Sequence, residues 1–140
     1  MPSASADQCE ANEVVVRSLF RGILDSDYEL MRACFHDDAI CWAPPSSSRV
    51  GVQRKQSADT FVEGSKGMSE IFRRDDMKWE HHRIHAEGDH VWVFTTMSTV
   101  TNAGVQYDND YFWLFRFADG KIIEAWESTD TAHAFDVLGA

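Results

Sequence analysis

The most informative apolar pattern lies near the C-terminal end of the chain. Residues 107–130 form two runs rich in aromatic and β-branched side chains, separated by Ala118-Asp119-Gly120. Asp-Gly between two such runs is typical of a tight β-hairpin turn. The first run is apolar at nearly every position from Tyr111 to Phe117, and such a strand must be covered on both faces. The pattern therefore predicts a central strand of a sheet.

The first part of the chain has helical periodicity. Apolar residues recur every four positions at Ala11, Val15, Leu19 and Ile23. This spacing predicts an amphipathic helix of about five turns. Asp7 with Glu10, and Ser26 with Glu29, have the spacing of capping boxes. The second box would begin a short helix with a buried stripe at Leu30, Met31, Cys34 and Phe35.

Residues 39–43 are apolar and predict a strand that ends at Pro44-Pro45, with a loop at 46–49. Residues 52–72 keep helical spacing but contain Gly64 and Gly67, each costing about 1 kcal/mol in a helix. We therefore expect a third helix, either continuous or broken at Gly64. Strands are predicted at 79–86 and 91–99, and a short terminal helix at 132–138.

Helices followed by a meander of four strands predict an α+β fold. We expect a curved mixed sheet wrapped around three N-terminal helices, giving a cone with a pocket at its mouth. The chain shows no internal repeats, and its 140 residues favour one domain.

The composition excludes some classes of binding partner. The net charge of −10 argues against nucleic acid and anionic membrane surfaces. No stretch approaches the ~18 apolar residues of a membrane span, and residues 1–8 lack a signal-peptide pattern and are expected to be a mobile tail. Cys9, Cys34 and Cys41 are an odd number of cysteines with no useful spacing, which favours reduced thiols and a cytoplasmic protein. The sequence indicates no cofactor.

Three segments carry a family resemblance: FHDDAICWAPP at 35–45, AEGDHVWV at 86–93 and FRFADGKIIEAWESTD at 115–130. With the order of elements, they resemble the SnoaL-like group of the nuclear transport factor 2-like superfamily over about residues 10–139. The resemblance implies a single domain over 9–140. It specifies no reaction, because the superfamily includes isomerases, polyketide cyclases, epoxide hydrolases, dehydratases and non-enzymes, and fold does not fix function.

The family geometry and the period of two along a strand imply which side chains face the pocket. These are Cys41, Ala43, Trp92, Phe94, Thr96, Ser98, Tyr111, Trp113, Phe115, Ile123, Ala125 and Glu127. The result would be an apolar, aromatic cavity with one carboxylate.

Comparison with the catalytic residues of family members limits the reactions that fit this sequence. The positions that match the catalytic groups of ketosteroid isomerase are Ala43, Leu19 and Trp113, so all three groups are missing. The acidic residue of limonene epoxide hydrolase matches Glu127. Its arginine–aspartate pair falls on Phe94 and Thr96, and its water-positioning residues fall on Cys41 and Ala43. The acid of polyketide cyclases matches Glu127 or Asp130, and this chemistry is not contradicted.

Glu127 is the main catalytic candidate. A carboxyl among aromatic side chains is desolvated, which raises its pKa toward neutrality and suits it to proton transfer next to a carbonyl. Alternatively, Glu127 would point to the pocket mouth and pair with Arg83 or Arg116. Asp130 is the second candidate, and its alternative role is to cap the terminal helix.

His81, His82 and His85 form a histidine cluster in the sequence. On a strand, His81 and His85 would share a face but stand ~13 Å apart, too far to bind one zinc ion. We therefore expect no metal site. Depending on the strand register, either His81 and His85 or His82 faces the pocket, and the other possibility is a surface strand at the sheet edge.

Three functions of different class follow. The first is an isomerase or cyclase that acts by acid/base proton transfer on an apolar, carbonyl-bearing small molecule. The second is a non-catalytic binding module for an apolar ligand, with an epoxide hydrolase or dehydratase-type lyase as a further alternative. The third is an association domain whose pocket is a packing defect.

The opposite face of the sheet predicts a homodimer. Phe112, Leu114, Ile122 and Trp126 would point outward and form one apolar patch. Soluble monomers rarely leave such a patch bare. A second copy could cover it through a two-fold interface, unless the terminal helix folds back over it.

Overall fold

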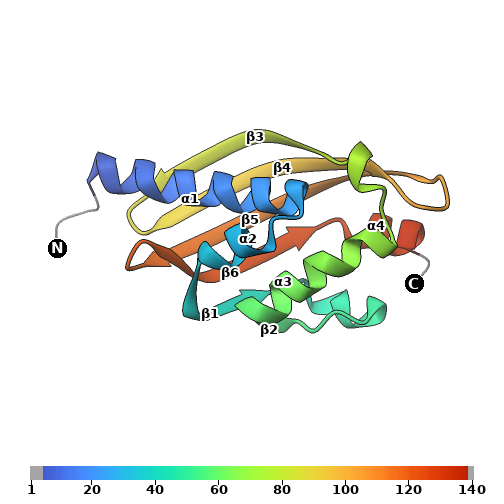
Figure 1. Ribbon diagram of the computed structural model, residues 1–140, viewed down its shortest axis with the longest axis horizontal. Coiled ribbons are helices and arrows are strands. Elements are labelled where there is room, and N and C mark those ends of the chain that lie inside the picture. Colours follow the sequence, from blue (N-terminus) through green and yellow to red (C-terminus); the bar gives the residue numbers. More distant parts are fainter. Residues whose placement is uncertain (1–4, 139–140) are drawn as a thin grey trace.

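The computed structural model describes residues 5–138 and contains one mixed six-stranded sheet (Figure 1). The elements are, in chain order, α1 (Ala6–Asp25), α2 (Tyr28–Ala33), β1 (Phe35–Trp42), η1 (Pro45–Val50), β2 (Lys55–Ser57), α3 (Ala58–Gly67), η2 (Met68–Glu70), η3 (Arg74–Asp76), β3 (Lys78–Glu87), β4 (His90–Val100), β5 (Gln106–Ala118), β6 (Lys121–Thr129) and α4 (Thr131–Leu138). The predicted α+β architecture is confirmed.

The sheet order is β2-β1-β6-β5-β4-β3. Strands β3 to β6 form the predicted antiparallel meander, and β1 pairs with β6 in parallel. Asp119 and Gly120 have φ values of 54° and 76°, as the two central residues of a tight hairpin turn require. The Asp-Gly signal therefore located the turn correctly, and β5 lies inside the sheet between β4 and β6.

Helix α1 covers the inner face of the sheet with Val16, Leu19, Phe20 and Ile23, each at most 4% exposed. The Phe20 ring lies 5.0 Å from the Trp79 ring and 5.9 Å from the Trp113 ring, measured between centroids. In Figure 1, α1 lies over the β3–β5 side of the sheet and α3 over the β1–β2 side. The core is therefore a layer of helices against one face of the sheet.

Several boundaries differ from the prediction because neighbouring polar residues compete for caps. Ser5, and not Asp7, accepts a hydrogen bond from the Gln8 amide at 3.1 Å, so α1 begins inside the segment predicted as a tail. Asp27, and not Ser26, caps α2. Residues 1–4 of the predicted tail lie outside the described residues.

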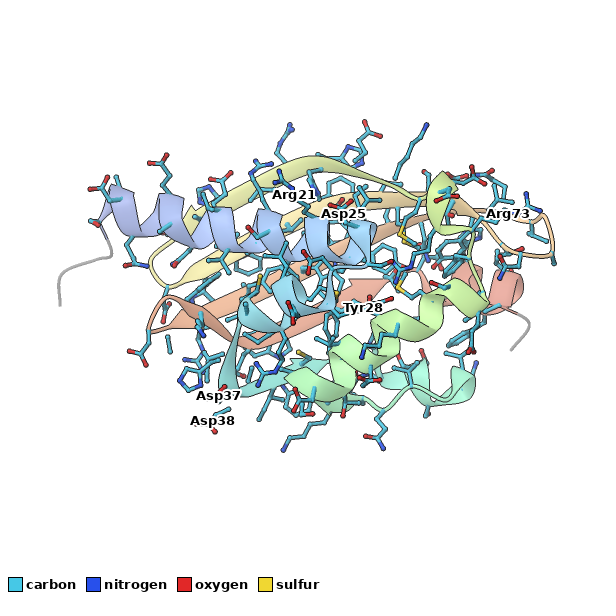
Figure 2. All side chains as sticks on the ribbon, in the orientation of Figure 1. Arg21, Asp25, Tyr28, Asp37, Asp38 and Arg73 are labelled. Atoms are coloured by element: carbon cyan, nitrogen blue, oxygen red, sulfur yellow. The ribbon has the colours of Figure 1, made fainter. Side chains whose placement is uncertain are left out.

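The structure corrects two predictions between residues 34 and 67 and decides a third point that the sequence left open. Phe35 begins β1 instead of ending the second helix, and β1 is longer than predicted. Its register against β6 shifts between Phe35 and Ile40, and Asp37 and Asp38 at this irregularity are exposed at the edge of the molecule (Figure 2). The loop predicted at 46–49 is the 3-10 helix η1. Gly64 does not break α3, which continues to Gly67.

Candidate ligand-binding and active site

A cavity of about 380 Å³ lies between the inner face of the sheet and the segments that cover one end of it. Its walls come from β1, β5 and β6, from α3 with the η2 segment, from η1, and from α4. In Figure 1, α4 lies near the C-terminal end of α3 at this end of the sheet. The volume is within the range of small-molecule sites, roughly 300–1,000 Å³.

Four predicted site residues line this cavity: Cys41, Tyr111, Trp113 and Glu127. They come from three adjacent strands, since Cys41 pairs with Ala125 across β1 and β6, and Trp113 pairs with Glu127 across β5 and β6. Residues that pair directly share a face of the sheet. The period of two therefore assigned β1, β5 and this part of β6 to the correct face, and Ala43 and Ala125 also line the cavity.

The predicted orientation of β4 was wrong. The buried side chains of β4 are Val91, Val93, Thr95, Met97 and Thr99. Trp92 is 52% exposed, and Phe94 and Thr96 lie with it on the outer face. Both faces of β4 carry apolar residues, and the short β-branched side chains are the ones that fit beneath α1. Trp92, Phe94, Thr96 and Ser98 are therefore not cavity residues.

A β-bulge in β3 separates the histidines. His81 pairs with Thr95, whereas Arg83 already pairs with Phe94, so His82 is the extra residue. His81 consequently faces inward, with Nδ1 3.0 Å from the Thr95 hydroxyl, whereas His85 faces outward opposite Trp92. A bulge shifts the alternation of side chains by one position. Neither register considered from the sequence holds, and neither His81 nor His85 lines the cavity.

A second bulge affects β6. Arg116 pairs with Glu124 and Phe117 pairs with Ile122, so Ile123 is the extra residue. Ile122 is fully buried, whereas Ile123 is only half-buried. The predicted inward position of Ile123 and outward position of Ile122 were therefore wrong, although Ala125 and Glu127, beyond the bulge, keep the predicted orientation.

Glu127 is the acidic residue of the cavity wall. Burial against the strands raises its pKa from 4.5 to about 7. The surrounding strands desolvate the carboxyl, and Glu127 borders both this cavity and a groove on the outer face of the sheet. Arg116, one expected partner, instead pairs with Glu124 on the other face of the sheet, and Arg83 donates to the His82 carbonyl at 2.8 Å. At neutral pH a carboxyl with this pKa is present in both protonation states and can accept or donate a proton.

Asp130 has a structural position. Its carboxylate accepts a hydrogen bond from the His133 amide at 3.1 Å, which caps the N-terminus of α4. Asp130 is exposed and does not line the cavity. The capping alternative is therefore the one that the geometry supports.

Two polar neighbours of Tyr111 were missed from the sequence, Tyr107 and Asn109, and the three side chains interact on one face of β5. The Tyr107 and Tyr111 hydroxyl oxygens are 2.8 Å apart, and Asn109 Nδ2 donates to the Tyr107 hydroxyl at 2.8 Å. Their spacing in YDNDY is the period of two that places them on one face. Burial raises the Tyr107 pKa and raises the Tyr111 pKa well above its usual value.

The apolar wall also contains residues from outside the predicted set: Phe61, Met68, Phe72, Trp79, Met97 and Phe135. Cys41 is chemically inert here, since burial, together with the charge of Glu127, raises its thiol pKa to about 12. Much of the wall is therefore apolar, and its tyrosine hydroxyls and its carboxyl come from β5 and β6.

The outer face of the sheet carries an exposed aromatic surface, formed by Trp92, Phe94, Phe112, Leu114 and Trp126 around a groove of about 320 Å³. We call it the outer patch. The Phe94 and Phe112 rings stack with centroids 4.6 Å apart, and Phe112 is 56% exposed. Helix α4 lines the cavity on the other side, so it does not cover this patch.

Comparisons with known proteins agree with this fold. One structure with the same fold is a protein of unknown function from Burkholderia pseudomallei, described as NTF2-like, with a TM-score of 0.82, 17% identity, and coverage of 93% of this chain and 98% of that one. TerC, crystallised with polyporic acid, has a TM-score of 0.81 at 18% identity and coverage of 93% and 99%. A protein named as a SnoaL-like polyketide cyclase from Jannaschia sp. CCS1 has a TM-score of 0.79 at 18% identity, with 99% of both chains covered.

At these identities the structural matches establish the fold alone. No curated protein matches the sequence. No helix among residues 5–138 is long and apolar enough to cross a membrane. The SnoaL-like domain model matches residues 16–125, which is most of the chain. The chain therefore belongs to the SnoaL-like domain family.

Proposed function

We propose that this protein is a small-molecule isomerase or cyclase that moves a proton on an apolar, carbonyl-bearing substrate held in the cavity. The observation that carries this proposal is Glu127, a carboxyl on the wall of an aromatic cavity whose pKa burial raises to about 7. A group with a pKa near the working pH is the most effective acid/base catalyst.

The rest of the cavity selects the substrate. The rings of Trp79, Tyr111 and Trp113 lie within 6.4 Å of their neighbours and form a continuous aromatic wall. Such a wall favours a flat, ring-bearing molecule, because aromatic rings bind one another through large apolar contact areas. TerC, which has this fold, was crystallised with polyporic acid. The polyketide cyclase name of the Jannaschia protein points to the same class of substrate.

Ligand binding can be tested with 2-tetralone, a bicyclic ketone. Because Trp79 and Trp113 line the cavity, we expect the ketone to quench tryptophan fluorescence in a saturable titration. Trp113→Phe should reduce the quenching, whereas Trp92→Phe, on the outer face, should leave it unchanged. If a broad set of ring-bearing ketones changes neither the emission nor the heat of titration, the cavity is a packing defect and the proposal fails.

Two other functions use the same cavity. A non-catalytic binding module would bind the ketone without exchanging its protons, and Glu127→Gln would then change affinity but no reaction. An epoxide hydrolase or dehydratase-type lyase is less well supported, because water activation requires polar groups at Cys41 and Ala43, which are a buried thiol and an alanine.

We further propose that two copies associate through the outer patch. Trp92 and Phe112 are each more than half exposed, and they are diagonal neighbours on adjacent strands, since Trp92 pairs with Leu114 and Phe112 with Phe94. A two-fold interface would cover both at once. Sedimentation at low micromolar concentration should show a species of about twice 15.9 kDa. Phe112→Glu should dissociate it, whereas Val14→Glu, an equally exposed site on α1, should not. A 15.9 kDa species in the unaltered protein would refute the dimer.

The three free thiols, Cys9, Cys34 and Cys41, support a reducing compartment. We therefore propose that the protein functions in the cytoplasm. Localisation of a tagged copy in the native host would test this directly.

A further inference from the structure

The polar part of the cavity wall contains a chain of hydrogen bonds that ends at Tyr111. Asn109 is 3% exposed, and both of its amide hydrogens are used: Nδ2 donates to the Tyr107 hydroxyl at 2.8 Å and to the Asp130 carbonyl at 3.0 Å. Tyr107 is 1% exposed, and the Tyr111 hydroxyl oxygen lies 2.8 Å from its own. Three side chains are thus connected in one line.

The direction of this line follows from the donors available. Tyr107 has one hydroxyl hydrogen and already accepts from Asn109. Within residues 5–138, the Tyr111 oxygen is the other partner of the Tyr107 hydroxyl. The distance fits either hydroxyl as donor, and donation from Tyr107 to Tyr111 is the arrangement that gives the Tyr107 hydrogen an acceptor among these residues. The hydrogen of Tyr111 is then free to be donated to a third group.

The rings of both tyrosines are held in place. The Tyr107 ring lies between the rings of Phe72 and His133, with centroids 5.2 and 5.3 Å away. The Tyr111 ring packs against Trp79 at 5.7 Å. Burial keeps the pKa of Tyr111 well above its usual value, so this hydroxyl stays protonated at neutral pH. A fixed, protonated hydroxyl on a cavity wall is a hydrogen-bond donor that costs little to orient.

Tyr111 and Glu127 lie on the same side of the cavity. Tyr111 pairs with Thr129 and Trp113 pairs with Glu127, so Tyr111 and Glu127 are diagonal neighbours on β5 and β6. Diagonal neighbours on one face are separated by about 7–8 Å between backbones. Both side chains therefore line the same part of the cavity.

We propose that Tyr111 donates a hydrogen bond to the carbonyl oxygen of the ligand, and that Tyr107 and Asn109 are positioning residues that direct its hydrogen there. This inference rests on the proposed function and names the group that binds the reacting oxygen. Thr129, which pairs with Tyr111 across β5 and β6, donates its own hydroxyl hydrogen to the Asp110 carbonyl at 2.7 Å.

The proton balance of the step is complete without another reactant. The Glu127 carboxylate removes a proton from the carbon next to the carbonyl, and the electron pair of that C–H bond moves to the oxygen, forming an enolate that Tyr111 stabilises. In an isomerisation, protonated Glu127 returns the proton to another carbon. In a cyclisation, the enolate carbon forms a bond to a second carbonyl carbon of the substrate, and the new alkoxide takes the proton from Glu127.

The infrared spectrum of bound 2-tetralone with a ¹³C-labelled carbonyl tests the proposal without requiring turnover. A carbonyl that accepts a hydrogen bond absorbs at lower frequency. We expect the bound ketone to absorb below its position in hexane, and Tyr111→Phe to return it most of the way. Tyr107→Phe should give an intermediate frequency, because Tyr111 keeps its hydroxyl but loses the donor that polarises it.

Binding of tetralin, the matched hydrocarbon, is the control. Tyr111→Phe should weaken 2-tetralone binding about fivefold, the effect of one neutral hydrogen bond of about 1 kcal/mol, and should leave tetralin binding unchanged. An unchanged carbonyl frequency in Tyr111→Phe overturns the inference. Equal weakening of both ligands overturns it too, because the substitution would then act through packing. If the carbonyl frequency shifts on binding but the ketone exchanges no protons, Tyr111 is a hydrogen-bond donor and the proposed catalysis is refuted. If neither ligand binds, the donor role and the proposed function are both refuted.

Discussion

The raised pKa of Glu127 predicts a specific dependence of stability on pH. In the unfolded chain this carboxyl titrates near 4.5, and in the folded protein near 7. Between these values the folded state binds a proton that the unfolded state has released. Stability therefore falls as pH rises from 4.5 to about 7 and is constant with respect to this group above that. Glu127→Gln removes the ionisation and with it this loss of stability.

The size of the effect follows from the shift. At about 1.4 kcal/mol for each pH unit, the full difference between the two pKa values corresponds to roughly 3 kcal/mol. Measured between about pH 5.5 and about pH 8.5, the unaltered protein should lose roughly 2 kcal/mol relative to Glu127→Gln. The glutamine variant should fold normally, because the substitution preserves shape.

Urea denaturation at the two pH values measures the free energy of unfolding of each protein. The difference in unfolding free energy between the two proteins cancels the contributions of the other titrating groups. Glu70→Gln is the matched control, since Glu70 is exposed on η2, and it should follow the unaltered protein. If Glu127→Gln also loses stability in parallel with the unaltered protein, the carboxyl is not desolvated and the physical basis for its catalytic role is wrong.

The remaining predictions concern stability. Arg74→Ala should lower the free energy of unfolding by about 2–3 kcal/mol, because the guanidinium donates to the carbonyls of Ile23 in α1 and Ser65 in α3. The control is Arg73→Ala, which removes the exposed side chain labelled in Figure 2 and should have little effect. Equal losses of stability in the two variants would refute the role of Arg74 in joining α1 to α3. Gly64→Ala should stabilise the protein by roughly 0.5–1 kcal/mol, because a Cβ there meets no atom within 4 Å and alanine favours the helix. Gly22→Ala should destabilise the protein, because the new Cβ would lie 2.7 Å from the Met31 Cγ. Thermal unfolding of the Gly64→Ala and Gly22→Ala variants measures both effects. A Gly22→Ala variant that is more stable than the unaltered protein would contradict the close packing of Gly22 against Met31.

Local patterns predicted the elements well wherever one physical signal dominated. The four-residue period of α1 and the Asp-Gly turn between β5 and β6 each have a single interpretation. The caps were displaced by one or two positions, because Ser5 and Asp27 compete with Asp7 and Ser26 and side chains of both kinds can cap a helix.

The cavity side of the sheet was harder to predict because of the two bulges. Each bulge reverses the alternation beyond it, and no residue type in β3 or β6 identifies His82 or Ile123 as the extra residue. On β4 both faces are apolar, so the choice between Val93 and Phe94 depends on the space under α1. The residues of β5 and the end of β6 were placed correctly because no bulge lies between Tyr111 and Phe115, or between Ala125 and Glu127.

Deuterium exchange of 2-tetralone tests the central claim most directly, because it detects proton transfer by Glu127 without knowledge of the natural substrate. In D₂O near neutral pH, proton NMR follows loss of the hydrogens next to the carbonyl. We predict that the protein accelerates this exchange above the buffer rate, and that Glu127→Gln, which still binds the ketone, does not accelerate it. Exchange at the buffer rate with bound ketone in the unaltered protein, or undiminished acceleration in Glu127→Gln, would contradict the claim.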